Sequence, residues 1–296
     1  MKETILLTGA TGFLGSHLLE ALLSDNYEVI ILKRSFSDTW RIKHLLNKIT
    51  SYDVDKEPLE KPFRENKINI VIHTATNYGR KGEPVSEIVE TNLLFPLRLL
   101  ETATPFDTFA FLNTDTLLHK YLTHYTLSKK QFVECLKGFS DKIQVVNLRM
   151  EHMYGPKADN TNFVTWLINE MGNEKDEIDL TKGEQKRDFI YISDVVSAHQ
   201  TVLRNLNGLD HFNEFDIGSG EFISIRDFVT KTRGIVEKIL GKKIKTVLNF
   251  GALPYRKGEF EEIMEDLSGL FVLGWKPLFS LEDGLDKTVR YQLERI

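Results

Sequence analysis

The fold is decided by the stretch Thr4-Ile-Leu-Leu-Thr-Gly-Ala-Thr-Gly-Phe-Leu-Gly15. Its first five residues are typical of a buried strand, and helix-spaced leucines follow its last glycine. Glycine suits the turn because the backbone needs unusual angles there and because a pyrophosphate must approach the main chain closely. The start of the helix also offers free N–H groups to phosphates. The stretch therefore predicts a dinucleotide site made by Gly9, Thr11, Gly12, Phe13, Leu14 and Gly15.

Short apolar runs alternate with helical patterns through the first half of the chain. Strand-like runs lie at 27–32, 68–73, 109–112 and 144–148, and helical patterns lie at 15–24, 86–103 and 128–136. Continuously apolar strands that alternate with helices are typical of a parallel sheet covered on both faces. We therefore predict an α/β fold, with a Rossmann doubly wound parallel sheet over residues 1–155 that binds a dinucleotide.

The pattern loses its regularity after Gly155-Pro156. Charged loops near 173–179 and 241–245 are mixed there with short strands and helices. We expect residues 156–296 to form mainly a smaller α+β substrate-binding lobe at the carboxyl edge of the sheet. Segments near 187–220, with strand-like runs at 189–191 and 215–217, are expected to return to that sheet.

The composition excludes several classes of protein. A formal charge of −5 and a pI near 6.0 give no general attraction to nucleic acid or to an anionic membrane. The single cysteine, Cys135, excludes an internal disulfide and a cysteine-rich metal site, and it fits a reducing cytoplasm. No signal-peptide pattern is visible, and the apolar runs fall short of the ~20 residues that a membrane span needs. We expect a cytoplasmic protein with no metal, nucleic-acid or membrane partner.

The second strand-like run ends in Lys33, Arg34 and Ser35. The residue at this place decides which nicotinamide cofactor a Rossmann domain prefers, because an acidic side chain would repel a 2′-phosphate. Two cations and a hydroxyl suit a phosphate, so NADP(H) is the predicted cofactor and NAD(H) the alternative. The same residues would also suit a solvated surface. Asp53 and Val54, after a third short strand, are predicted to hold the adenine edge.

A tyrosine and a lysine stand four positions apart, at Tyr125 and Lys129. On a helix both side chains share one face, where the ammonium stabilises a phenolate for proton transfer. The spacing alone would also fit an exposed pair. The helix, however, follows a strand that ends in Asn113-Thr-Asp-Thr116, and open α/β sheets bind ligands at the carboxyl ends of their strands. This position predicts an active site.

Motifs spread along the whole chain support this interpretation. They are Thr8-Gly-Ala-Thr-Gly-Phe-Leu-Gly15, His73-Thr-Ala-Thr76, Asn92, Tyr125-Thr-Leu-Ser-Lys129, Leu148-Arg149, Tyr154-Gly-Pro156, Arg187-Asp-Phe-Ile-Tyr191 and Gly274-Trp-Lys-Pro277. Together they resemble the extended short-chain dehydrogenase/reductases of the NAD-dependent epimerase/dehydratase family, which act on nucleotide sugars. The stretches 73–80, 113–116 and 253–259 resemble, more narrowly, the CDP-abequose and CDP-paratose synthases. Those enzymes reduce the 4-keto group of a CDP-3,6-dideoxyhexulose with NADPH on the way to O-antigen sugars.

The resemblance implies a role for each matching residue. Tyr125 is the acid or base, Lys129 holds the cofactor ribose, and Thr114 hydrogen-bonds the reacting sugar oxygen, with Thr116 as its rival. Beyond Tyr125 and Lys129, further cofactor-binding residues are Thr74, Ala75, Thr76 and Asn92, whereas His73 is interpreted as structural. The substrate-binding set is Asn77, Tyr78, Thr116, His152, Arg187, Arg256 and Glu259. Within it the two arginines grip the diphosphate and Glu259 holds the nucleotide ribose, while His152 either contacts the sugar phosphates or packs in a core.

Two departures from the family pattern narrow the function. Dehydratases of the family place Asp-Glu after the catalytic threonine, whereas Asp115 is followed here by Thr116, which argues against water elimination. The segment from Thr114 to Tyr125 is also about a dozen residues shorter than in the family, so part of the rim of the substrate pocket is missing.

We expect an NADPH-dependent reductase of a 4-keto nucleotide sugar that is a homodimer. An NAD-dependent 4-epimerase is the alternative, and a non-catalytic dinucleotide-sensing regulator is a distant one because such proteins typically lack the tyrosine–lysine pair. In relatives the dimer is a four-helix interface, formed by the helix at 86–103 and the helix that carries Tyr125. The first of these helices bears an excess of leucines at positions 93, 94, 97, 99 and 100, although full burial would also explain them.

Overall fold

The computed structural model describes residues 2–255 and 264–296, which fall into two units. Unit 1 comprises Met1–Met150, Val196–Asp216 and Ser268–Trp275. Unit 2 comprises Glu151–Val195, Ile217–Leu267 and Lys276–Ile296. Within the described ranges, no helix combines the length and the apolar character needed to cross a lipid bilayer.

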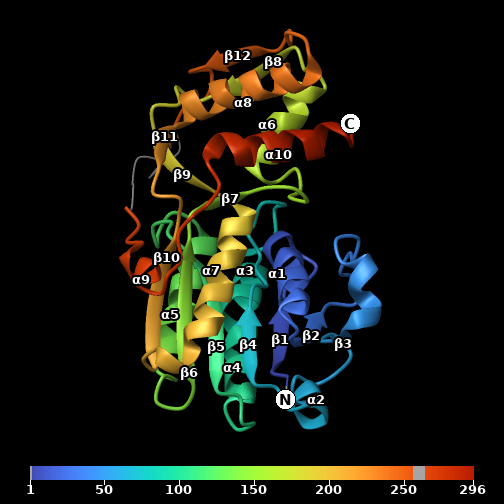
Figure 1. Ribbon diagram of the computed structural model, residues 1–296, viewed down its shortest axis with the longest axis vertical. Helices are drawn as coiled ribbons and strands as arrows, with labels where there is room; N and C mark the ends of the chain where they lie inside the picture. Colours follow the sequence, from blue (N-terminus) through green and yellow to red (C-terminus); the bar gives the residue numbers. More distant parts are fainter. Residues whose placement is uncertain (1, 256–263) are drawn as a thin grey trace. The chain divides into compact units, whose positions relative to one another are not determined.

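Unit 1 is built on a sheet with the strand order β10-β6-β5-β4-β1-β2-β3, seven strands in the described part of the chain (Figure 1). Its strands are β1 (Thr4–Thr8), β2 (Glu28–Lys33), β3 (Thr50–Asp53), β4 (Ile70–His73), β5 (Ala110–Thr116), β6 (Gln144–Met150) and β10 (Phe212–Ile217). The pairs from β3 to β6 are parallel. The strand order reverses between β1 and β4, and folds of this class bind ligands at the carboxyl ends of those two strands.

Helices cover both faces of this sheet, as a doubly wound fold requires (Figure 1). One face carries α1 (Phe13–Ser24) and α7 (Ile192–Asn205), and Gln200 of α7 donates to Asp25 at the end of α1 at 2.7 Å. The other face carries α3 (Val85–Val89), the π-helical turn η2 (Glu90–Leu94), α4 (Phe95–Ala103) and α5 (His124–Lys137). Shorter segments are η1 (Lys43–Lys48), α2 (Glu60–Glu65), η3 (Leu206–Gly208) and α9 (Ser268–Val272). The predicted Rossmann fold is confirmed.

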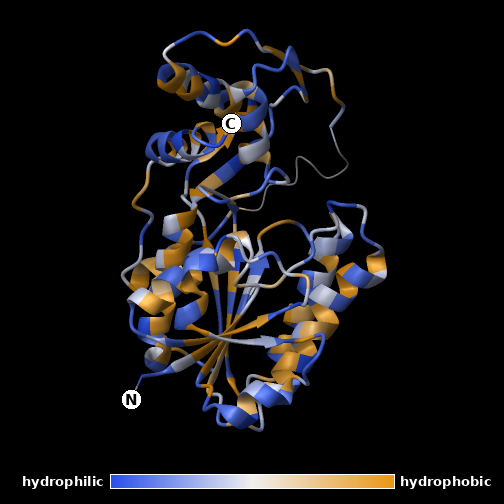
Figure 2. Ribbon diagram, turned by 90° about the vertical axis from the view of Figure 1, so that its right-hand side faces the viewer, coloured by the Kyte–Doolittle hydropathy of each residue, from blue (hydrophilic) through white to orange (hydrophobic). Residues whose placement is uncertain are grey.

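The core of unit 1 consists of the strand interiors and the helix faces that cover them, and the central strands are its most hydrophobic part (Figure 2). Leu6, Val71 and Phe111 come from three adjacent strands and are fully buried. They belong to one cluster with Leu100 of α4 and Phe132 of α5. Burial of side chains of this size contributes ~1.5–3 kcal/mol each. The cluster therefore holds β1, β4 and β5 in place, and with them the polar residues at the ends of these strands.

The strand β5 is longer than its apolar run, which ends at Leu112. It continues through Thr116, and all seven of its residues are buried. The polar end can stay in the sheet because its side chains are hydrogen-bonded: Asn113 donates to Asn147 Oδ1 at 2.8 Å, and Thr114 donates to the His73 carbonyl at 2.9 Å. Hydrophobic periodicity misses such a strand end.

The described residues of unit 2 form two small sheets and three helices that pack together. One sheet joins β7 (His152–Tyr154), β9 (Lys186–Tyr191) and β11 (Phe222–Ser224), and the other pairs β8 (Glu177–Leu180) with β12 (Val247–Phe250) in parallel. The helices α6 (Phe163–Gly172), α8 (Ile225–Leu240) and α10 (Leu281–Leu293) contact one another. The predicted α+β character of this region agrees with these elements.

One of the two returning strands does not join the large sheet. The run 215–217 lies in β10, at an edge of that sheet, as expected. The run 189–191 instead lies in β9, which pairs with β7 and β11. The reason is packing within unit 2, where the rings of Phe189 and Phe228 of α8 stack with centroids 3.8 Å apart.

Gly15 is the point at which α1 meets the turn after β1. A Cβ on Gly15 would lie 2.1 Å from the carbonyl oxygen of Gly9 and 2.9 Å from the Cα of Ala10. Both atoms belong to backbone, so neither can move aside as a flexible side chain would. The absence of a side chain at residue 15 therefore lets the helix start directly against the turn.

We expect Gly15→Ala to displace the start of α1, because the new methyl overlaps backbone. Dinucleotide affinity, measured by fluorescence titration with NADPH, should fall at least about tenfold, and thermal unfolding should occur at a lower temperature. The control is Gly234→Ala in the middle of α8, an exposed position where a Cβ meets nothing within 4 Å. That variant should gain up to about 1 kcal/mol from helix propensity and bind NADPH normally. Equal effects at both positions would contradict the interpretation.

Candidate active site

The turn after β1 and the loop after β4 are packed against each other. Gly9 has φ of +68°, and a Cβ there would lie 2.6 Å from both Ala75 N and Thr74 Oγ1. The Thr8 hydroxyl accepts the N–H groups of Thr74 and Ala75 at 3.2 and 3.3 Å, and Thr74 Oγ1 donates to the Thr8 carbonyl at 2.7 Å. These contacts bring together the glycine turn and residues 74 and 75, all of which are candidate cofactor residues.

His73 supports this arrangement from the core. Its Nδ1 lies 2.9 Å from the Thr8 hydroxyl, and its ring is fully buried among Phe95, Phe111 and Phe132. Burial, and secondly the charge of Lys129, hold the pKa of His73 well below its usual value. The imidazole is therefore neutral, and the structural role proposed for it agrees with these contacts.

Asn92 stands in the π-helical turn η2 and holds the next part of the loop. Its Oδ1 accepts the Asn77 N–H at 2.8 Å and the Thr76 hydroxyl at 3.1 Å. Its Nδ2 donates to the Asn77 carbonyl at 2.8 Å and to Ser128 of α5 at 3.1 Å. A single π turn commonly marks a functional site. Here it directs one amide toward both the loop and the helix of Lys129.

The predicted phosphate-binding residues after β2 are engaged by carboxylates. Arg34 Nε lies 2.7 Å from Asp55 Oδ1, and the Arg34 guanidinium lies 4.8 Å from the ring centre of Phe36. Ser35 donates its hydroxyl to Asp53 at 2.7 Å and its N–H to Asp55 at 2.9 Å. A 2′-phosphate at this place would therefore compete with Asp55 for Arg34. Asp55 was missed in the sequence because it lies just beyond the predicted pair Asp53 and Val54.

The other predicted cofactor residues lie near this turn. Lys33 is half-buried at the end of β2, and its carbonyl accepts the Val54 N–H at 3.0 Å. Leu14 is buried in α1, and the ring of Phe13 packs edge-on against His17. The carbonyl of Thr11 accepts Nη1 of Arg41 at 3.2 Å, and Arg41 is itself buried. Arg41 was missed because it lies in an irregular segment that carries no motif.

The candidate catalytic residues Tyr125 and Lys129 lie on α5, which begins at a capping box. The Thr123 hydroxyl accepts the Thr126 N–H at 3.1 Å, and the Thr126 hydroxyl accepts the Thr123 N–H at 3.0 Å. Lys129 is 1% exposed, and its Nζ has no hydrogen-bond partner in the described part of the chain. Burial lowers the pKa of Lys129 to about 8, although the charge of Asp115 opposes this shift. A buried ammonium without a partner is a position that a bound ribose hydroxyl could satisfy.

The two candidate threonines at the end of β5 make different contacts. The Thr114 hydroxyl donates to the His73 carbonyl at 2.9 Å, which turns it toward β4. The Thr116 hydroxyl accepts the Leu118 N–H at 3.2 Å and is hydrogen-bonded to Tyr125. In this structure Thr116 is therefore the threonine in contact with the tyrosine.

Few positive charges near Tyr125 stabilise the ionised form of its phenol. Burial raises its pKa well above the usual value, and Tyr78 and Asp115 add to the shift. Arg80 and the Thr116 hydrogen bond act in the opposite direction. Asp115 is itself buried and pairs with Lys130 at 2.7 Å. The phenol is therefore protonated at neutral pH, which suits a proton donor.

The described substrate candidates outside unit 1 are His152 and Arg187. His152 Nδ1 lies 3.0 Å from Glu151 Oε2, and its ring is near that of Phe189. Arg187 lies on β9 and donates to the Lys186 carbonyl at 2.6 Å. The candidates Arg256 and Glu259 lie outside the described residues. Beside Arg187, the buried Asp188 accepts the Ser219 hydroxyl and the Gly220 N–H at 2.8 and 2.7 Å.

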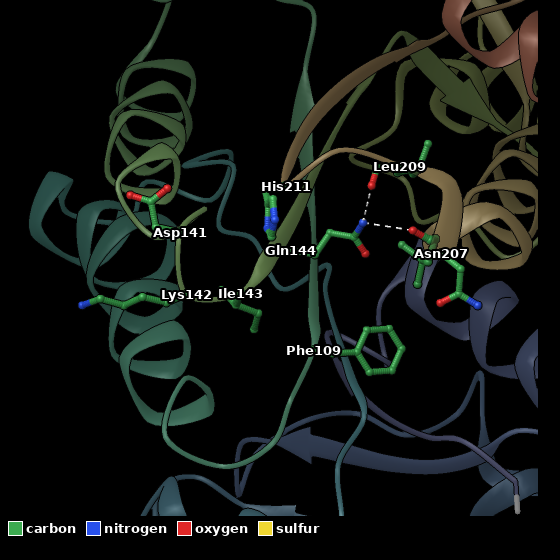
Figure 3. Close-up of a pocket in the computed structure, with 9 residues that line it drawn as sticks. Phe109, Asp141, Lys142, Ile143, Gln144, Asn207, Leu209 and His211 are labelled. Carbon is green, nitrogen blue, oxygen red and sulfur yellow. Dashed lines mark hydrogen bonds between the residues drawn. The ribbon is translucent and has the colours of Figure 1, made fainter.

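A surface hollow lies at the opposite end of the large sheet (Figure 3). It has a volume of about 340 Å³ and is lined by Gln144 at the start of β6, by residues of η3 and by neighbouring loops, including Phe109, Ile143 and His211. Gln144 spans its floor and donates to the carbonyls of Leu206 and Leu209 at 2.9 and 3.0 Å. This hollow is at the amino ends of the strands, away from the glycine turn, and it contains none of the predicted site residues. Its polar contacts tie two loops together.

Comparison with known proteins agrees with this site. The sequence model of the NAD dependent epimerase/dehydratase family matches residues 5–218. The chain belongs to this family. It is 35% identical to a CDP-abequose synthase of Salmonella muenchen over 97% of both chains, and 29% identical to that of Salmonella typhimurium over 98% of both. A crystal structure of a UDP-glucuronic acid 4-epimerase from Bacillus cereus in complex with NAD superposes with a TM-score of 0.80 and 25% identity, covering 98% of this chain and 96% of that one.

Membership of the NAD dependent epimerase/dehydratase family makes the chain an NAD(P)-dependent enzyme of the extended short-chain dehydrogenase/reductase type. Its fold is that of nucleotide-sugar epimerases, and its curated relatives modify nucleotide sugars. The glycine turn fits a dinucleotide because Gly9 and Gly15, where a Cβ would overlap neighbouring backbone, let α1 begin directly after the turn, and the first N–H groups of a helix suit phosphates. The unpartnered Nζ of Lys129 fits the same group.

Replacement of Lys129 by Met should stabilise the cofactor-free protein. The pKa of Lys129 is about 8 in the folded chain against 10.5 ordinarily, so burying its charge at pH 7 costs about 3 kcal/mol. Between pH 8 and 10.5 the unfolded chain binds more protons than the folded chain, and the stability of the parent should rise with pH there. Urea unfolding at several pH values should show this rise in the parent and lose it in Lys129→Met. Lys238→Met on the exposed side of α8 is the control. A Lys129→Met variant that keeps the parent's pH dependence would refute the assignment.

Proposed function

We propose that the protein is an NADPH-dependent reductase of a 4-keto nucleotide sugar, of the CDP-4-keto-3,6-dideoxyhexulose type, and forms a deoxysugar nucleotide. The observation that carries the proposal is the tyrosine–lysine pair on α5, beside two threonines of β5, in a chain 35% identical over its length to a CDP-abequose synthase. The product would be a sugar nucleotide that serves O-antigen synthesis, in the reducing cytoplasm that a single cysteine suits.

The proposed chemistry is a two-electron reduction of the C4 carbonyl. NADPH, when bound, supplies the hydride that reaches C4. Tyr125 donates its phenolic proton to the oxygen of the forming alcohol and becomes a phenolate, which solvent reprotonates. Lys129 holds the cofactor ribose and stabilises the phenolate, since its ammonium lies one helical turn away on the same face. Charge and protons balance, because one hydride and one proton convert the ketone to an alcohol.

A threonine hydroxyl would stabilise the oxygen as negative charge develops on it. The family pattern supports Thr114 in this role. The contact of Thr116 with Tyr125 supports Thr116, and Thr114 would have to leave the His73 carbonyl to reach a substrate. Both alternatives remain part of the proposal, and variants separate them.

For the substrate, we propose that Asn77 and Tyr78 contact the sugar and that Arg187, with Arg256, binds the diphosphate. Tyr78 supports this because its ring lies 4.8 Å from that of Tyr125, centroid to centroid. Glu259 is proposed to hold the nucleotide ribose. His152 is paired with Glu151 and packed near Phe189, which favours a structural role over a phosphate contact.

A 4-epimerase is the second candidate function. The observation that favours it is the ion pair of Arg34 with Asp55, because carboxylates beside the adenosine ribose suit NAD rather than NADP. An epimerase would retain a tightly held NAD and would need no added reductant. Incubation of the purified protein with NADPH and a panel of 4-keto nucleotide sugars separates the two, since only a reductase consumes NADPH in stoichiometric amounts.

NADPH should bind more tightly than NADH, because a charge-assisted contact of Arg34 with the 2′-phosphate contributes ~1.5–3 kcal/mol. Arg34→Glu should reverse the order, and Asp55→Asn should increase the preference by releasing Arg34 from its ion pair. Fluorescence titration with both cofactors measures these affinities. Arg64→Glu, an exposed arginine of α2, is the matched control and should change neither. Equal affinity of the parent for NADPH and NADH would refute the preference.

Tyr125→Phe should retain NADPH binding and lose ~10²–10⁴-fold in turnover, because the ring remains and the transferable proton does not. Thr114→Ala and Thr116→Ala compare the two hydroxyls under the same assay, as rates of NADPH consumption with a 4-keto CDP-sugar. The variant with the larger fall in kcat identifies the hydroxyl that contacts the reacting oxygen. Near-normal turnover in Tyr125→Phe would exclude the proposed reaction.

We also propose that the protein is a homodimer through α4 and α5. Leu99 and Leu100 are fully buried within unit 1, so they explain part of the leucine excess without a partner. Leu94 is 41% exposed, and Leu93 and Leu97 are partly exposed on the same helical segment. Sedimentation at micromolar concentration should give the mass of a dimer, and Leu94→Arg should shift it toward the monomer. A monomeric parent would reject the dimer.

A further inference from the structure

The side chains of Arg80, Tyr78 and Tyr125 are stacked in unit 1. The rings of Tyr78 and Tyr125 have centroids 4.8 Å apart and planes inclined by 43°. The guanidinium carbon of Arg80 lies 4.5 Å from the ring centre of Tyr78, within the range of a cation–π interaction. Tyr78 is thus in contact with a cation and with the proposed proton donor. No role was assigned to Arg80 from the sequence, where it is only the last residue of the stretch 73–80.

The turn that carries Tyr78 and Arg80 is held from two directions. The Asn77 backbone exchanges two hydrogen bonds of 2.8 Å with the side chain of Asn92. Gly79 has φ of +68° and donates its N–H to Asn77 Oδ1 at 2.9 Å. A Cβ on Gly79 would lie 2.6 Å from Ile88 Cδ1 of α3, so the turn is also packed against that helix. The backbone that carries Tyr78 and Arg80 is therefore held in place by these contacts.

We propose that Arg80 is a positioning residue for Tyr125, holding its ring through Tyr78 and stabilising its phenolate when the proton has been given away. The inference rests on the proposed role of Tyr125 as proton donor. Arg80 acts through another side chain and supplies a positive charge that does not depend on pH, because a guanidinium stays protonated throughout the range in which proteins fold.

The groups around Tyr125 show why a second cation matters. Burial raises the pKa of Tyr125, and Tyr78 and the carboxylate of Asp115 on β5 raise it further. Arg80 lowers this pKa, and so does the Thr116 hydrogen bond. Lys129, one turn along α5, has a pKa of about 8 and loses its charge above that pH. Lys130 is a further cation nearby, but it is paired with Asp115 at 2.7 Å. Above pH 8 Arg80 therefore remains as a cation that lowers the pKa of Tyr125.

The test is the ionisation of Tyr125 with NADP⁺ bound and no sugar present. Ultraviolet absorbance of tyrosinate is titrated against pH, and the curve of the Tyr125→Phe protein is subtracted. In Arg80→Gln the midpoint should rise by about one pH unit or more. Arg80→Lys keeps the charge but not the planar stack and should fall between the parent and Arg80→Gln. Arg290→Gln, an exposed arginine of α10 that pairs with Asp286, is the control and should match the parent.

Tyr78→Phe supplies a second variant, since it keeps the ring that links Arg80 to Tyr125 and removes only the phenol that raises the pKa of Tyr125. Its midpoint should lie at or below that of the parent, and adding Arg80→Gln to Tyr78→Phe should raise the midpoint again by about one pH unit. A parent-like midpoint in Arg80→Gln would overturn the proposal, as would a parent in which Tyr125 does not ionise before the protein unfolds. The titration uses no sugar substrate, so its outcome is independent of the proposed reduction. The role of Arg80 can be refuted while the reductase activity is confirmed, and the role of Arg80 can be confirmed while the reductase activity is refuted. If both hold, the alkaline limb of kcat/KM for reduction moves to higher pH in Arg80→Gln.

Discussion

The hydrogen bonds of Thr8 are the contact on which the site in unit 1 depends. Its hydroxyl and carbonyl join the end of β1 to Thr74 and Ala75 at the end of β4, across the place where the strand order reverses. Buried polar groups are costly unless they are satisfied, so this side chain fixes both loops at once. Thr8 fixes the end of β1 against the end of β4, so the glycine turn packs onto the loop after β4. The buried His73 ring, whose Nδ1 lies 2.9 Å from the Thr8 hydroxyl, completes these contacts.

The sequence was sufficient for the features that follow from apolar patterning and from glycine. The strand Thr4–Thr8, the helix after Gly12 and the parallel order of the first half were predicted, because buried apolar strands leave a strong periodic signal. The tyrosine and lysine of α5 were predicted from spacing and position. Polar strand ends left no such signal, and therefore the extension of β5 to Thr116 required the structure. The location of residues 189–191 in β9 also required it, since a three-residue apolar run fits either sheet.

Side-chain partners were the second kind of information that the sequence lacked. Two cations after β2 look like a phosphate site, yet Arg34 is paired with Asp55, a residue 21 positions along the chain. Thr114 and Thr116 share one face of β5 by alternation, and their side-chain contacts distinguish them: Thr114 donates to a carbonyl and Thr116 contacts the tyrosine. The contact of Arg80 was likewise missing from the sequence. Its separation from Tyr125 along the chain does not indicate that the ring of Tyr78 lies between the two side chains.

The π turn at Glu90–Leu94 has a consequence for how this helical segment can change during evolution. A π turn closes its hydrogen bonds from i to i+5, so it holds about one residue more than an α turn and takes up that residue without rotating the helix that follows. The segment before the turn presents Ile88 to Gly79, and the segment after it buries Leu99 and Leu100. A related chain with one residue fewer here could close the turn to an ordinary α turn and keep both of these contacts. What it would change is the position of Asn92 within the turn.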